Sequence, residues 1–293
     1  MPDWYPSRYG AADRIGAGNE LSADRVLAAL RIPTSGRVVQ LAQLTGAASP
    51  VIPPRIHHQV ILAHESGADP HSRQGDNGFT ALQEHVVTSY HIGCHLDGLG
   101  HVGIDGVYYN GLRHDEIYSP TGLVELGVEN VRPWVGRGVL LDVARVRGVP
   151  RLPADYEVTD IDLAAAAERA GVTIAPGDAV LVNTGWATLA DDDPATYAST
   201  EPGLGVAAAA WLTDLRISLV GVDNWGCDVH PNPDPRQFFP VHQQLLTKTG
   251  TYILENIRTD ELVAAEASEF LFVLSPPRHE GATGGLVAPL AVL

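Results

Sequence analysis

Short apolar runs separated by polar, turn-forming residues recur along the whole chain. Most of these runs span four to eight residues and are rich in valine, isoleucine and leucine. Runs of this length and composition are typical of β-strands that are buried on one or both faces. We expect strands at residues 38–42, 56–62, 84–96, 138–143, 178–184, 219–223, 251–256 and 270–274.

Fewer segments carry the spacing of apolar residues that predicts a helix. Residues 21–31 do so, and Ser22 is a suitable N-cap. Residues 159–170, which begin with acidic side chains, and residues 205–215 and 241–249 are the other expected helices. Because strands outnumber helices, a mixed sheet or barrel with a few covering helices fits better than a doubly wound fold.

The chain shows no internal repeat, low-complexity tract or linker, so we expect a single domain over residues 1–293. Residues 1–20 form an expected N-terminal arm. Residues 66–80 are rich in glycine and small polar side chains, which predicts a long loop. Loops of this length often act as a lid or as a pocket wall.

Composition restricts the classes of partner and compartment. The formal net charge is −16, and an acidic surface repels phosphate backbones, so we expect no nucleic-acid partner. No apolar run reaches the roughly 18 residues of a membrane span, and the N-terminus lacks signal-peptide features. Two cysteines, Cys94 and Cys227, provide no disulfide framework. A cytoplasmic protein is the expectation.

Histidine is unevenly distributed, and eight of the twelve histidines lie between His57 and His101. Within the expected strand 84–96, alternation would place His91, His95 and Asp97 on one face, with Gly93 leaving room between them. Two imidazoles and a carboxylate form a mixed nitrogen and oxygen site suited to zinc or manganese. The turn at residues 98–100 would bring His101 back toward the same place.

Other interpretations of these residues remain open. The same face could be the polar side of an exposed strand, although its flanking residues are apolar enough to be buried. Cys94 would point to the opposite face as a small core residue, and a nucleophilic cysteine is a lesser alternative. Further metal donors could come from later in the chain, where the candidates are His230, His242, Glu255 and His279.

The run from His91 to His101 resembles the H-x-G-T-H-x-D-x-x-x-H signature of the metal-dependent cyclase family, which includes bacterial kynurenine formamidase and isatin hydrolase. The likeness extends to nearly the whole chain. Residues 239–246 and 252–256 are similar to the distal metal-site segment of that family, and residues 281–285 to its glycine-rich turn. Residues 4–10 and 109–111 are similar to a longer branch of it.

The resemblance implies an α/β fold with a mixed, largely antiparallel, barrel-like β-sheet and flanking helices, assembled as a homodimer or homotetramer. It implies one or two divalent ions, Zn²⁺ or Mn²⁺, and His101 as the catalytic acid and base. The implied metal ligands are His91, His95, Asp97, His242 and Glu255, with Asp97 able to bridge. Two positions depart from the signature, because Cys94 replaces the usual threonine and Leu99 a frequent proline.

The expected reaction is hydrolysis of a C–N or C–O bond in a small amide, lactam, imide or lactone by metal-activated water. The substrate is expected to be cyclic or aromatic, and Phe79, Tyr109 and Trp225 are candidates to line its pocket. Two alternatives keep the metal. One is a lyase, dehydratase or cyclase that stabilises an enolate, and the other is a non-catalytic metal-binding protein.

Overall fold

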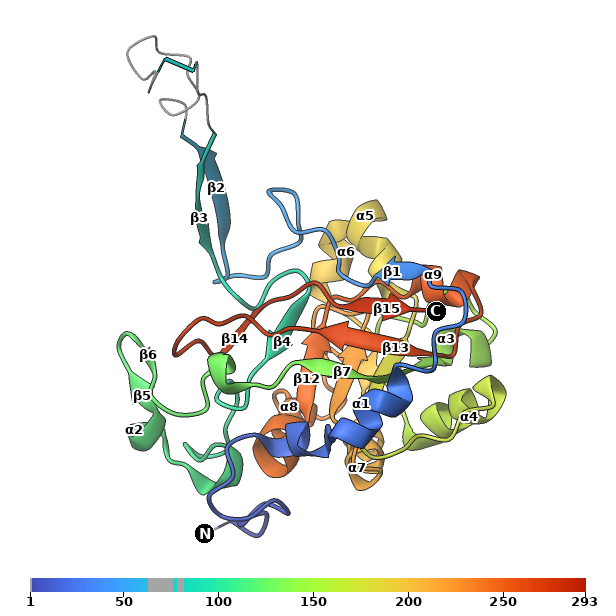
Figure 1. The fold of residues 1–293 in the computed structure, drawn as a ribbon, viewed down its shortest axis with the longest axis horizontal. Helices are drawn as coiled ribbons and strands as arrows, with labels where there is room; N and C mark the ends of the chain where they lie inside the picture. The colour runs from blue at the N-terminus through green and yellow to red at the C-terminus, as the bar shows by residue number, and fades with distance from the viewer. Residues whose placement is uncertain (1, 63–75, 78–81) are drawn as a thin grey trace.

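One curled sheet runs through the middle of the protein and opens like half of a barrel (Figure 1). The structure is a computed structural model that describes residues 2–62, 76–77 and 82–293. Within these residues the strands are β1 (Val38–Gln40), β2 (His57–Ile61), β3 (Glu84–Thr88), β4 (His95–Asp97), β5 (Tyr118–Ser119), β6 (Gly122–Leu123), β7 (Trp134–Asp142), β8 (Glu157–Val158), β9 (Ala179–Asn183), β10 (Gly203–Leu204), β11 (Leu219–Val222), β12 (Tyr252–Glu255), β13 (Glu269–Leu274), β14 (Gly284–Leu286) and β15 (Leu290–Val292).

The main sheet has the strand order β1-β15-β13-β7-β9-β11-β12-β4-β14. Strands β7, β9, β11 and β12 are parallel in the centre, and the strands on both sides of them pair antiparallel. Five of the eight pairings described are therefore antiparallel, which confirms the expected mixed sheet. Strands β9 and β11 are buried throughout, as their continuous apolar runs require.

Helices flank the sheet and connect its parallel strands. Their bounds are α1 (Ala23–Ala29), α2 (His114–Ile117), α3 (Val143–Val146), α4 (Asp160–Ala170), α5 (Leu189–Asp192), α6 (Pro194–Ser199), α7 (Val206–Asp214), α8 (Pro240–His242) and α9 (Asp260–Ala264). Both α1 and α4 pack on β7, and α7 packs on α4. No helix in the described part of the chain is long and apolar enough to cross a membrane.

The helix starts follow the local capping signals. Ser22 accepts a hydrogen bond from the backbone of Arg25 at the start of α1. Thr159 and Asp162 satisfy each other's backbone amides at the start of α4, which forms a capping box. The expected helix at 241–249 is α8 followed by a π-helix, Gln243–Thr249, and Gly250 ends it in the left-handed conformation.

The N-terminal arm packs closely on the body of the protein. Asn110 holds it, because its side-chain amide donates to the carbonyls of Gly10 and Asp13. Its side-chain oxygen also accepts a hydrogen bond from the backbone amide of Ser7. The hydroxyl of Tyr252, in the main sheet, donates to the carbonyl of Ile15.

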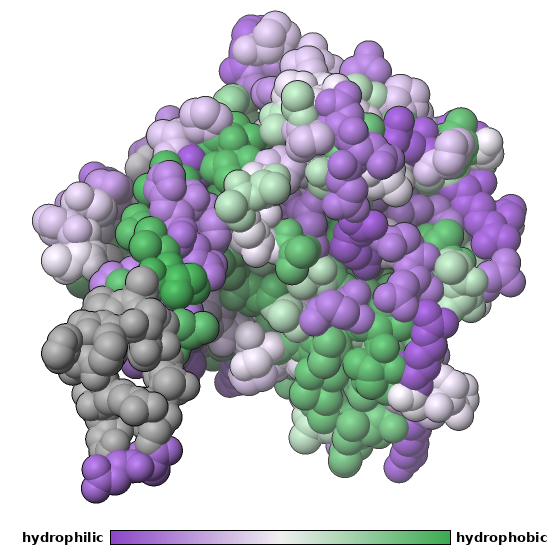
Figure 2. Space-filling model, turned by 90° about the horizontal axis from the view of Figure 1, so that it is seen from above, coloured by the Kyte–Doolittle hydropathy of each residue, from purple (hydrophilic) through white to green (hydrophobic). Residues whose placement is uncertain are grey.

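The prediction of one strand over residues 84–96 is wrong. β3 pairs only with β2, and together they form a two-stranded arm that projects from the body, whereas β4 belongs to the main sheet (Figure 1). Val86 and Val87, which we expected to be buried, are exposed on this arm. Figure 2 shows apolar surface beside the grey segment near the arm. The expected loop at 66–80 lies almost entirely outside the described residues.

A sharp bend at Gly93 separates the arm from β4. Its φ angle is +50°, a conformation that side chains with a Cβ rarely adopt. A Cβ at this position would also lie 1.9 Å from the Thr45 hydroxyl oxygen. Gly93 is therefore required by the backbone and by the close approach of Thr45, rather than to leave space between side chains on one strand.

Replacing Gly93 by alanine should lower the free energy of unfolding more than the same change at Gly106. Both glycines have positive φ angles, but a Cβ at Gly106 meets no atom within 4 Å. Gly106→Ala should cost about 1–2 kcal/mol for the left-handed backbone alone. Gly93→Ala should cost about 1–3 kcal/mol more, because Thr45 must move. Urea denaturation measures both, and equal losses would contradict the packing argument.

Candidate metal centre

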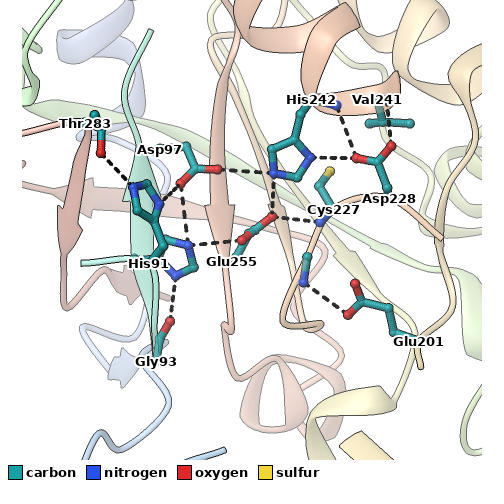
Figure 3. Close-up of polar contacts among 12 residues, drawn as sticks. His91, Gly93, Asp97, Glu201, Cys227, Asp228, Val241, His242, Glu255 and Thr283 are labelled. Atoms are coloured by element: carbon teal, nitrogen blue, oxygen red, sulfur yellow. Dashed lines mark hydrogen bonds and ion pairs between the residues drawn. The ribbon is translucent and has the colours of Figure 1, made fainter. Parts of the chain in front are cut away.

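Four buried side chains from three separate elements converge on one point (Figure 3). His95 and Asp97 occupy alternate positions of β4, so they share a face. Glu255 lies on the neighbouring strand β12, directly opposite His95 in the antiparallel register. His242 comes from the end of α8. The sheet pairing and one helix end thus bring together residues that are about 160 positions apart in the sequence.

The ring of His95 is held in one orientation. Its Nδ1 lies 2.8 Å from the carbonyl oxygen of Gly93, which can only accept, so Nδ1 donates. Nε2 then faces two carboxylates, at 3.0 Å from Glu255 Oε2 and 3.5 Å from Asp97 Oδ1. The bend at Gly93 therefore fixes the chain path and also aims a metal-binding nitrogen at the site.

His242 is arranged in the same way. Its Nδ1 donates to Asp228 Oδ2 at 2.6 Å. Its Nε2 lies 3.2 Å from Glu255 Oε1 and 3.4 Å from Asp97 Oδ2. A carboxylate that accepts from one ring nitrogen fixes the tautomer and raises the basicity of the other, which is the usual arrangement around a metal-binding histidine.

This donor set suits a divalent cation. Two imidazole nitrogens and two carboxylates, all on buried side chains, surround one position. Among the described residues, His95 Nε2 and Asp97 Oδ2 are buried without a hydrogen-bond partner. Buried polar atoms of this kind ordinarily coordinate an ion or are paired. Nitrogen and oxygen donors together are typical of zinc and manganese sites.

The charges at the site are strongly coupled. Burial alone would lower the pKa of His95 and His242, but the negative charge of the carboxylates beside them raises the pKa of both above the usual range. Burial opposes ionisation of Asp97 and Glu255, yet the surrounding histidines lower the pKa of both. Protons and a cation therefore compete for the same ring nitrogens, so cation binding should strengthen as the pH rises.

His91 lies beside this cluster and not on the strand. Its Nδ1 is 2.7 Å from Asp97 Oδ1, and its Nε2 is 2.9 Å from the hydroxyl of Thr283. Gly284 on β14 makes room for the ring, since a Cβ there would lie 2.7 Å from His91 Cε1. The glycine-rich segment near the C-terminus thus lets β14 approach the site closely.

His101 reaches the site from the turn that follows β4. Its ring stacks on that of His91 with a centroid distance of 3.8 Å and an interplanar angle of 15°. Burial lowers the pKa of His101 to about 3, so the ring is neutral near pH 7. Donor atoms of His91, Asp97 and His101 lie within 4.8 Å of one another, as do those of His95, Asp97 and Glu255. Asp97 belongs to both groups.

Asp228 and Thr283, which orient His242 and His91, were not among the residues predicted for the site. Neither lies in the histidine-rich run. Asp228 lies between an expected strand and the expected helix that contains His242. The sequence does not show that the two side chains meet, because the path of the chain between them is set by the fold. His230 and His279, the other candidate donors, lie outside both groups.

The three candidate pocket residues have different surroundings. Trp225 belongs to an aromatic cluster with His230 and Phe239, and the Phe239 ring is 5.1 Å from that of His242. Tyr109 is fully buried, and its hydroxyl donates to Asp13 beneath the N-terminal arm, which is the position of a packing residue. Phe79 lies outside the described residues.

Known proteins with the same fold include several hydrolases. A crystal structure of a novel cyclase is 28% identical, with a TM-score of 0.89 over 98% of both chains. Isatin hydrolase A from Ralstonia solanacearum is 22% identical, with a TM-score of 0.66 over 87% of this chain and 91% of that one. A predicted metal-dependent hydrolase from Bacillus stearothermophilus is 18% identical, with a TM-score of 0.55 over 87% and 97%.

The last two likenesses establish the fold alone because their identities are low. No curated protein sequence matches the chain. The sequence profile of one family, described as "Putative cyclase", matches residues 34–229. That stretch is well over half of the chain and includes the whole histidine-rich run. The chain therefore belongs to the cyclase family.

Proposed function

We propose that this protein is a metal-dependent hydrolase that cleaves a C–N or C–O bond in a small amide, lactam, imide or lactone. The observation that carries the proposal is the convergence of two oriented ring nitrogens, His95 Nε2 and His242 Nε2, on the carboxylates of Asp97 and Glu255. The names of two structural neighbours, an isatin hydrolase and a metal-dependent hydrolase, support this class of reaction.

In this proposal His95, Asp97, His242 and Glu255 hold one cation. His91 would hold a second, with Asp97 as the shared ligand, because its Nδ1 lies 2.7 Å from Asp97 Oδ1. Zinc and manganese both suit these donors. The number of ions, one or two, and the choice between zinc and manganese both remain predictions.

A divalent cation at this centre would polarise the scissile carbonyl and make water more acidic. His101 is the residue that moves the proton. Its ring is neutral, and it is partly exposed, whereas His95 and Asp97 are buried. It takes a proton from the attacking water as the new carbon–oxygen bond forms. It then passes that proton to the leaving nitrogen or oxygen as the C–N or C–O bond breaks.

The aromatic rings of Trp225 and Phe239 stand beside His242, with the Trp225 and Phe239 planes at 83° to each other. Aromatic side chains next to a site favour contact with planar rings, so a cyclic or aromatic substrate fits the proposal. Assembly as a homodimer or homotetramer remains a prediction, and so does a cytoplasmic location.

Asp97→Ala should lose most of the bound metal, because Asp97 belongs to both donor groups. Elemental analysis of the purified protein, after loading with zinc or manganese and removal of free ion, measures this. Asp162→Ala is the matched control, since Asp162 is also a buried aspartate but serves the capping box of α4. Metal content equal to that of wild type in Asp97→Ala would contradict the ligand assignment.

His101→Asn should lower kcat by roughly 10²–10⁴-fold while metal content stays unchanged, because proton transfer typically contributes that much. His114→Asn, at an exposed histidine that stacks on Tyr118, should leave both quantities unchanged. Loss of metal together with activity in His101→Asn would instead place His101 among the ligands.

Turnover is expected on at least one member of a panel of N-formyl aromatic amines, cyclic imides, isatins and lactones, assayed with zinc and then with manganese. Hydrolysis in ¹⁸O-labelled water must place the label in the product. Product formation without the label would favour the lyase or cyclase alternative. Absence of turnover with either metal would count against the hydrolase.

A further inference from the structure

The residues at positions 225–228, which we call the 225–228 loop, contact both distal donors of the metal centre. The backbone amide of Cys227 donates to Glu255 Oε1 at 2.8 Å. The next residue, Asp228, accepts from His242 Nδ1 at 2.6 Å and from the amide of Val241 at 2.7 Å. Two consecutive residues of one loop thus orient Glu255 and His242.

Glu201 holds this loop from its other side. Its carboxylate Oε2 accepts from the Gly226 amide at 3.1 Å, immediately before the amide that serves Glu255 (Figure 3). The backbone of Glu201 is fixed as well, because it exchanges two hydrogen bonds with His230 at 2.9 and 3.0 Å. These bonds fix where the side chain of Glu201 starts relative to the end of the loop.

The contact between Glu201 and the loop is tight. Glu201 is completely buried, and a Cβ added at Gly226 would lie 2.7 Å from its Oε1. Only glycine at position 226 allows the carboxyl group to lie against the backbone at this distance. Since the Gly226 and Cys227 amides are adjacent, movement of one by a few tenths of an ångström changes the direction of the other.

We infer that Glu201 is a positioning residue, which fixes the 225–228 loop and through it holds Glu255 and His242 in the geometry that binds the cation. The inference rests on the proposed function, because it requires the cation site described above. Groups that orient metal ligands typically change metal affinity by about 10–100-fold when they are removed.

The protonation state of Glu201 determines which substitution preserves this role. Burial, together with the negative charge of Glu255, raises the pKa of Glu201 well above its usual range. The neutral acid has nearly the shape and hydrogen-bonding capacity of glutamine, whose carbonyl oxygen can accept from the same amide. Glutamine should therefore preserve the loop, and leucine, which has no acceptor, should release it.

The test compares metal affinity in Glu201→Leu, Glu201→Gln and a control. The control is Glu20→Leu, at another buried glutamate, which pairs with Arg216 and Tyr9. Dissociation constants for Zn²⁺ and Mn²⁺ are measured by competition with a chelator, and the visible spectrum of the Co²⁺-loaded protein reports the coordination geometry. If Glu201 only stabilised the fold, Glu201→Leu would lower the melting temperature and leave the dissociation constants and the Co²⁺ spectrum unchanged.

We expect Glu201→Leu to weaken metal binding by about 10–100-fold and to alter the Co²⁺ spectrum. Glu201→Gln should restore the affinity to within about threefold of wild type, and Glu20→Leu should retain the wild-type affinity and spectrum. If Glu201→Leu does not fold, Gly226→Ala provides the same comparison, because its Cβ displaces the carboxyl group.

Two outcomes separate this inference from the proposed function. Wild-type protein that binds neither Zn²⁺ nor Mn²⁺ would overturn the cation site, and the inference with it. Wild-type protein that binds metal, with unchanged affinity and spectrum in Glu201→Leu or Gly226→Ala, would overturn the inference alone.

Discussion

The structure is organised around the burial of two carboxylates, Asp97 and Glu255, on neighbouring strands of the main sheet. Burial of one such charge without a partner is unfavourable, and burial of two close together is more so. The histidines His95 and His242 compensate for them, and each ring is itself held by an acceptor on its far side. This balance of charge explains why so many separate elements end at one point. It also makes a divalent cation the natural occupant.

Strand pairing in the sheet fixes the relative positions of the side chains at the site. Pairing of β4 with β12 sets Glu255 opposite His95, and pairing of β4 with β14 brings Gly284 under the ring of His91. Sites on paired strands are more precise than sites on loops, because the ladder of hydrogen bonds fixes their spacing. His242 comes from a helix end, and the 225–228 loop restrains it there through hydrogen bonds to Asp228. The same loop restrains Glu255 through the amide of Cys227.

Residues that do not bind the cation therefore carry much of the site's geometry. Gly93 both bends the chain and presents its carbonyl to His95. Thr283 and Asp228 each hold the outer nitrogen of a histidine. Groups that orient metal ligands in this way typically affect metal affinity strongly, although they do not touch the ion.

The sequence by itself determined the strands with continuous apolar runs, the helices with caps at Ser22 and Thr159, and the candidates His95, Asp97 and His101. These features depend on neighbours within a few residues, so local pattern is enough to predict them. The resemblance to a known family added His242 and Glu255, which lie far along the chain.

Only the tertiary structure decided how the site is built. Alternation on a single strand placed His91 with His95, but the left-handed bend at Gly93 ends that strand and a contact with Asp97 places His91 instead. Burial likewise cannot be deduced from an apolar side chain alone, as Val86 and Val87 on the exposed arm show. Asp228 and Glu201 were not predicted because their partners are set by strand order and loop path, which depend on contacts between residues distant in the sequence.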